Sequence, residues 1–117
     1  MISNEAIEAF NSRLTVNVNT IKTMKAQDQD RVKQHGTAAE VLLKNKDFAY
    51  FVHSFKFEVC DALVEIKTHT ADDNTLRVAL SNQLSGIDSF ISSLQRAVYL
   101  KNKVVSLEQK PDPAETL

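Results

Sequence analysis

The scarcity of helix breakers is the feature that most limits what this chain can fold into. The 117 residues include only two glycines and two prolines, and both prolines, Pro111 and Pro113, lie close to the C-terminus. Because glycine and proline are the residues that most often interrupt regular structure, their rarity indicates long uninterrupted elements. The sequence therefore predicts an all-α protein, a small bundle of long helices.

Composition indicates one globular domain and excludes some function classes. Hydrophobic residues make up 43% of the chain and charged residues 25%, which is ordinary for a soluble domain. The formal net charge of −1 gives no field that would attract nucleic acid or anionic lipid, so we expect neither as a partner. The single cysteine, Cys60, cannot form an internal disulfide, and the N-terminus has no apolar run, which favours an unexported, reducing setting.

Residues 1–36 are predicted to form an N-terminal helical arm. From Ser3 onward apolar residues recur at steps of three and four, with the polar Asn17 on the same stripe. The alternation of apolar and polar residues over 14–19 would also suit a β-strand, but we favour a helix. The apolar members of the stripe are Ile7, Phe10, Leu14, Ile21 and Met24.

Three local signals predict where helices stop and restart in the first half of the chain. Gly36 is expected to end the arm, since glycine closes a helix in the left-handed conformation without steric cost. Thr37 and Glu40 match the capping box, in which both side chains bind free backbone amides of a new helix. A kink or short break is expected near Asn45, which can cap the helix that begins after it.

Residues 37–107 are predicted to form a helical core around a central helix. One face of that helix carries apolar residues at helical spacing: Phe48, Phe51, Val52, Phe55, Val59, Ala62, Leu63 and Ile66. At 100° per residue, Tyr50, Phe57 and Val64 lie on the opposite face, with His53 and Cys60 beside them. Both sides of this helix are therefore expected to need cover.

A long last helix is predicted to begin after a turn at 67–69. Thr70 and Asp73 match a second capping start. Gly86 is a weak point that could mark a bend or a close approach to another helix. Residues 108–117 are expected to form a disordered tail. The apolar stripe of this helix consists of Leu76, Leu80, Leu84, Ile87, Ile91, Leu94, Val98 and Val105, widened by Phe90, Ala97 and Val104.

No catalytic or metal site is predicted. The three histidines His35, His53 and His69 are not at metal-ligand spacing, and no second cysteine accompanies Cys60. The chain contains no glycine-rich phosphate loop and no nucleophile elbow. We therefore expect a protein that is not an enzyme and that has no cofactor, no metal and no small-molecule substrate.

Surplus apolar surface is the feature that points toward a function. Two stripes together are more than a small bundle can cover, so we expect a protein partner. The N-terminal stripe could cover the central helix within one chain or in a neighbouring subunit, and the lone Asn17 in that stripe favours self-association. The predicted partner or oligomer interface consists of Ile7, Phe10, Leu14, Ile21, Tyr50, Phe57 and Val64.

Residues 42–107 resemble a group of small helical accessory and structural proteins of tailed bacteriophages. The similarity consists of the run from Leu42 to Phe48, a helix that ends at 68–70, and Asp73, Arg77 and Leu80 before a heptad-like last helix. The group commonly has an aromatic residue, often tryptophan, before the central turn, where this chain has Leu63 and Val64.

The resemblance implies a non-catalytic phage protein that acts through helix-mediated contacts in virion assembly or DNA packaging. It would then be found in the cytoplasm of a bacterial host or in the virion. The alternative is a soluble helical regulator or inhibitor that binds a host protein.

Overall fold

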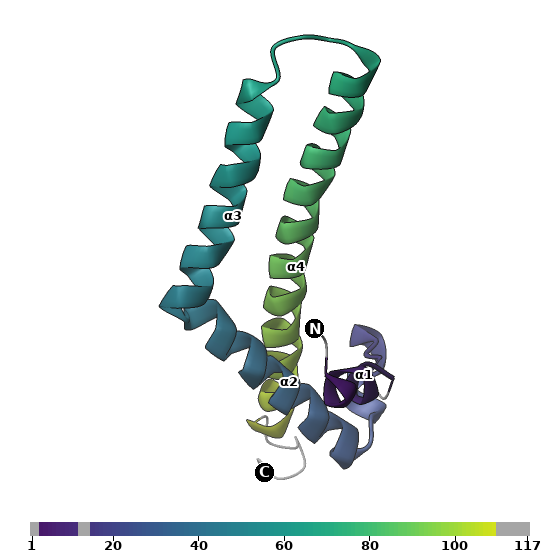
Figure 1. Cartoon of the computed structure of the whole chain (residues 1–117). Helices are drawn as coiled ribbons and strands as arrows, with labels where there is room; N and C mark the ends of the chain where they lie inside the picture. The colour runs from purple at the N-terminus through teal and green to yellow at the C-terminus, as the bar shows by residue number, and fades with distance from the viewer. Residues whose placement is uncertain (1–2, 12–14, 110–117) are drawn as a thin grey trace, which may run out of the picture.

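The protein is helical along nearly all of the residues that the computed structural model describes, which are 3–11 and 15–109 (Figure 1). These ranges contain no β-strand, so the all-α prediction is confirmed. The elements are α1 (Asn4–Asn11), the short 3₁₀ helix η1 (Val18–Thr23), α2 (Ala26–Lys44), α3 (Lys46–Glu65) and α4 (Ala71–Gln109).

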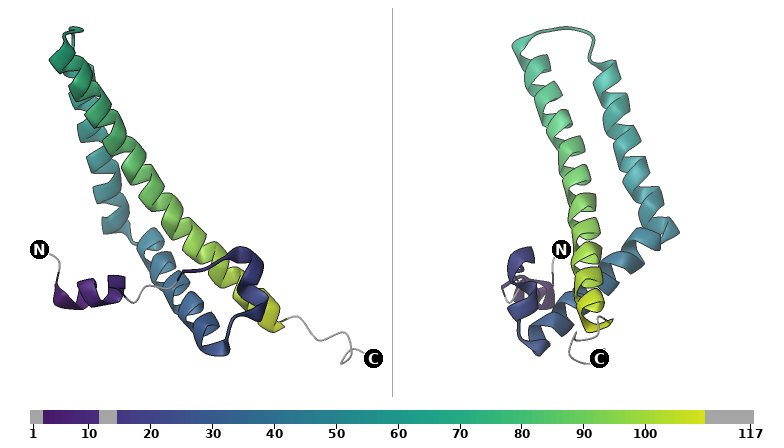
Figure 2. Two further views of the ribbon diagram at one scale, coloured as in Figure 1. Left: turned by 90° about the vertical axis from the view of Figure 1, so that its right-hand side faces the viewer. Right: turned by 180° about the vertical axis from the view of Figure 1, so that it is seen from behind.

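The long helix α4 forms the axis of the molecule. Its 39 residues span about 58 Å at 1.5 Å per residue. In two opposite views α3 lies beside the N-terminal half of α4 and α2 crosses its C-terminal half (Figures 1 and 2). The radius of gyration of the chain is 20.1 Å, whereas a compact domain of this length would have about 13 Å. The fold is therefore elongated rather than spherical.

The apolar core lies where η1, α2 and the C-terminal half of α4 meet. It consists of Ile21, Val32, Leu100 and Val104, and the side chain of Val104 is fully enclosed. Partly buried residues surround this cluster: Val16, Val18, Met24 and Leu107. The predicted central helix, now α3, therefore lies away from this cluster, and Val59 is its only buried residue.

The predicted helix end at Gly36 is wrong. Helix α2 continues from Ala26 to Lys44, and Gly36 is buried within it without a positive φ. A Cβ atom at this position would lie 2.3 Å from the Cβ of Lys101 and 2.7 Å from the carbonyl oxygen of Ala97. The backbones of α2 and α4 therefore approach closely at Gly36, and the predicted boundary between arm and core falls inside a helix.

The capping box predicted for Thr37 and Glu40 is absent for the same reason. Because the helix does not restart there, the Thr37 hydroxyl donates to the carbonyl oxygen of Lys33 one turn earlier, at 2.9 Å. The carboxylate of Glu40 instead binds Lys44 at 2.8 Å and reaches across to Lys101 of α4 at 3.0 Å. Glu40 therefore joins the two helices beside the glycine contact.

The single long N-terminal helix predicted from Ser3 to Met24 is also wrong. Helix α1 ends at Asn11, residues 15–17 are not helical, and η1 begins at Val18. The side chain of Asn17 accepts a hydrogen bond from the backbone amide of Asn19 at 2.9 Å, which caps η1. An asparagine that binds the backbone locally competes with helix continuation, and the Asn17 cap therefore starts η1 as a separate element.

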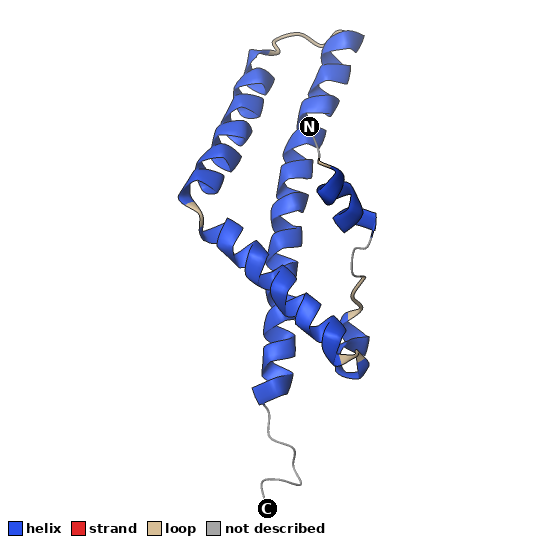
Figure 3. Cartoon of the chain, turned by 60° about the horizontal axis from the view of Figure 1, so that its bottom comes forward, coloured by secondary structure: helices blue, strands red, loops and turns tan. Residues whose placement is uncertain are grey.

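Two predicted helix starts have the expected hydrogen bonds. The side chain of Asn45 accepts from the amide of Phe48 at 2.9 Å, so the predicted break before α3 is confirmed. At the start of α4 the Thr70 hydroxyl accepts from the amide of Asp73 at 3.1 Å. A hydrogen bond from Thr68 to the Asp73 carboxylate lowers the pKa of Asp73. These bonds fix the turn between α3 and α4, which is drawn as a loop in Figure 3.

The two glycines give a matched test of the contact between α2 and α4. Gly36→Ala is expected to destabilise the protein by about 1–3 kcal/mol, because the added methyl group overpacks the helix contact. Gly86→Ala is expected to stabilise it by about 0.5–1 kcal/mol, because Gly86 has open space around it and alanine is the better helix former. Urea unfolding followed by circular dichroism measures both changes. Equal effects of the two substitutions would contradict a close contact at Gly36.

Glu40 makes the stability of this contact depend on pH. Hydrogen bonds to Lys44 and then Lys101 lower the pKa of Glu40 from 4.5 to about 2. Since the folded state holds the charged form, its stabilisation is complete above about pH 4.5 and is lost as the pH falls toward 2. The difference in melting temperature between the wild type and Glu40→Gln should therefore be constant near neutral pH and shrink between pH 4.5 and 2.

A carboxylate without such partners provides the control for this pH series. Glu58 is exposed on α3, and no ion pair of it is found within the described ranges. Glu58→Gln is expected to change the melting temperature little at any pH in the series. A Glu40→Gln difference that grows as the pH falls would contradict the predicted direction.

Candidate protein-contact surface

Large apolar side chains are exposed along α3. They are Tyr50, Phe51, Phe55, Phe57 and Val64, of which three are phenylalanines. Tyr50, Phe51, Phe57 and Val64 are each exposed to 65% or more, so these apolar side chains stay in contact with water in the isolated chain.

The first part of this surface is the α3 outer stripe, which we define as Tyr50, Phe57 and Val64. These side chains are 65%, 68% and 73% exposed. Helix α4 lies on one side of α3, and no described element lies against the opposite side (Figures 1 and 2). At 100° per residue the stripe lies on that opposite side. Of the two alternatives, cover within the chain or by another subunit, the described residues provide no cover within the chain.

The second part lies along one flank of the seam between α3 and α4, and sequence analysis missed it. We define it as the seam flank, formed by Phe51, Phe55 and Phe90. The ring of Phe90 contacts Phe48 edge to face, with centroids 6.3 Å apart. Phe51 was predicted to face the core but is 69% exposed, because α4 covers only part of the circumference of α3.

An ion pair closes the other flank of this seam. The Nζ atom of Lys56 lies 2.9 Å from the Oδ1 atom of Asp88, which joins α3 to α4. At 100° per residue Lys56 and Phe51 fall on opposite flanks of the seam. The opposite charges at positions 56 and 88 are the signal that could have shown which flank is polar and which is apolar. The rings of Tyr50 and Phe51, 5.3 Å apart, connect the outer stripe to the seam flank.

Of the N-terminal residues predicted for the interface, the described ones, Ile7 and Ile21, are not brought together with the α3 outer stripe. Ile7 is exposed on α1. Leu14 and the side chain of Phe10 lie outside the described residues. Ile21 was predicted as an interface residue, but it is 4% exposed and belongs to the core of the monomer, where it packs with Val32, Leu100 and Val104. This assignment is corrected, because η1 folds back onto α4 and carries Ile21 inward.

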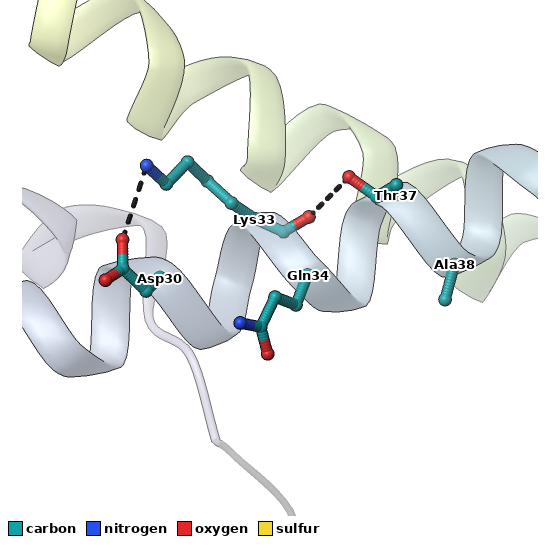
Figure 4. Close-up of a pocket in the computed structure, with 5 residues that line it drawn as sticks. All are labelled: Asp30, Lys33, Gln34, Thr37 and Ala38. Carbon is teal, nitrogen blue, oxygen red and sulfur yellow. Dashed lines mark hydrogen bonds and ion pairs between the residues drawn. The ribbon is translucent and has the colours of Figure 1, made fainter.

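A shallow hollow on α2 is the other feature that could hold a ligand (Figure 4). Its charged groups bind one another, since Lys33 Nζ lies 3.3 Å from Asp30 and 2.7 Å from Glu108 of α4. The hydrogen bonds to Glu108 and then Asp30 raise the pKa of Lys33. Gln34, Thr37 and Ala38 complete the lining. This hollow contains internally paired charges, and we assign no ligand to it.

Within residues 3–11 and 15–109, His, Cys, Asp and Glu side chains form no group of three that could hold a metal ion. The histidines lie apart, on α2, on α3 and in the loop before α4. Among the described helices none combines the length and the apolar character needed to cross a membrane.

Comparison with protein-family models, with curated proteins and with solved structures found no match to this chain. The resemblance to tailed-phage proteins therefore stays a prediction made from the sequence.

Proposed function

We propose that the protein is a non-catalytic binding protein that acts through helix contacts and associates with copies of itself. The observation that supports this proposal is the α3 outer stripe, where two aromatic rings and a valine face water on a regular helix. Monomeric proteins rarely leave contiguous apolar patches uncovered unless a partner binds there. The resemblance of residues 42–107 to tailed-phage proteins extends the proposal to a role in virion assembly or DNA packaging.

Self-association is favoured by the exposed side chains of the α3 outer stripe and by the low charge of the chain. Tyr50, Phe57 and Val64 are 65%, 68% and 73% exposed, and burying them against a second copy would remove apolar surface from water. A formal net charge of −1 provides little repulsion between copies.

Size-exclusion chromatography coupled to light scattering tests this proposal, with Phe57→Glu as the variant. The wild type is expected to have a mass of at least twice 13.1 kDa, and the variant is expected to have the monomer mass of 13.1 kDa. Because Phe57 is mostly exposed, the substitution should change the stability of the monomer by no more than about 0.5 kcal/mol.

Tyr99→Glu serves as a control that also places a carboxylate on an exposed aromatic position, but on α4. It should leave the mass unchanged. A wild type that is monomeric at every concentration would contradict self-association and would favour the alternative of a regulator that binds a different protein. A pull-down from native lysate followed by mass spectrometry would then identify that protein.

A further inference from the structure

The α3 outer stripe has the period of a two-stranded coiled coil. Tyr50, Phe57 and Val64 are seven residues apart, and His53 and Cys60 each come three positions after a stripe residue. This spacing is that of the a and d positions of a heptad, which form the seam between two supercoiled helices. All five side chains are exposed. The occupant that fits such a seam is a second helix with the same heptad period. Helix α3 of another copy has this period.

The charges beside the stripe distinguish the two possible orientations of that second helix. The carboxylates at positions 47, 58, 61 and 65 lie on one side of the stripe and Lys56 lies on the other, while Lys46 falls on the stripe itself, at the d position before Tyr50. In a parallel pair, each g position faces the e position five residues later in the other copy. Lys56 would then face Asp61 of a second copy, and the symmetry would make this pair twice.

An antiparallel pair would instead place the acidic sides of both helices together. Eight carboxylates would then lie along one side of the interface with no basic residue between them, and like charges on facing helices repel. Lys56 already binds Asp88, but an ammonium group has three N–H donors and can bind a second carboxylate. Charge complementarity therefore favours the parallel orientation.

We propose that the α3 outer stripe binds the same stripe of a second copy, in parallel and in register. This inference rests on the self-association proposed above and specifies its surface and orientation. In this arrangement the Cys60 side chains of the two copies face each other at a d position in the middle of the seam. In an antiparallel pair Cys60 would face Phe57, and the two Cys60 residues would be displaced by about 4.5 Å along the helix axis.

Disulfide cross-linking tests the orientation directly, because Cys60 is the only cysteine in the chain. The full-length protein at low micromolar concentration would be oxidised with diamide, which accepts the two hydrogen atoms released when two thiols form a disulfide. A non-reducing gel should then show a band at twice 13.1 kDa. The same protein unfolded in urea should show little of this band, since cross-linking by random collision is slow at this concentration.

Two valines provide a matched pair of variants. Val64 lies on the outer stripe and Val78 lies on α4, and both are well exposed. Val64→Glu should raise the dissociation constant of the dimer by at least about tenfold, because it places a carboxylate in a seam that association buries. It should also lower the cross-linked fraction to that of the unfolded chain. Val78→Glu should change neither quantity. Circular dichroism would verify that both variants remain folded.

The outcomes separate this inference from the proposal on which it rests. A monomeric wild type contradicts both. A wild-type dimer that Val64→Glu leaves intact and Phe90→Glu dissociates overturns this inference alone and moves the interface to the seam flank. A dimer that Val64→Glu dissociates, but in which Cys60 does not cross-link, overturns the parallel orientation. A dimer that cross-links through Cys60 and is lost in Val64→Glu supports the inference.

Discussion

The contact between α2 and α4 at Gly36 is the constraint on which the rest of the arrangement depends. Without a side chain at this position, the two backbones approach so closely that an added Cβ would overlap Lys101 and the carbonyl of Ala97. This approach allows Glu40 to reach Lys101 and brings Val32 against the C-terminal part of α4. The core therefore forms at one end of a long helix, and α3 is left with α4 as its main neighbour.

Signals that act within a few residues could be predicted from the sequence. Asn45 ends one helix and caps the next, and Thr70 binds the first turn of α4, because a side chain and the amide it binds are close in sequence. The position of the α3 outer stripe opposite the core-facing side could also be predicted, since it needs only the geometry of one helix, whereas its exposure depends on where the N-terminal segment packs. These features specify the helices and one apolar surface, but they do not specify how the helices pack.

Features that depend on distant contacts could not be predicted in this way. Gly36 was expected to end a helix and Gly86 to mark a bend or a close approach, whereas Gly36 has the close approach and Gly86 has open space. A glycine has no side chain that would tell the two roles apart, so only the position of the partner helix decides. Likewise Ile21 was assigned to an interface because residues 3–24 were interpreted as one helix. The structure instead starts the separate helix η1 after Asn17, and η1 places Ile21 in the core.

The two apolar faces of α3 differ in what an isolated chain can do with them. The face toward α4 is partly buried and is closed on one flank by the pair of Lys56 and Asp88, so it is used within the monomer. The outer stripe is not buried by any described part of the monomer. Exposed aromatic residues in a chain of net charge −1 would also favour non-specific association. The uneven charges beside the stripe oppose that outcome, because they make one orientation of a partner helix more favourable than the other. Specific pairing thus requires both the apolar period and the charge asymmetry, and α3 has both.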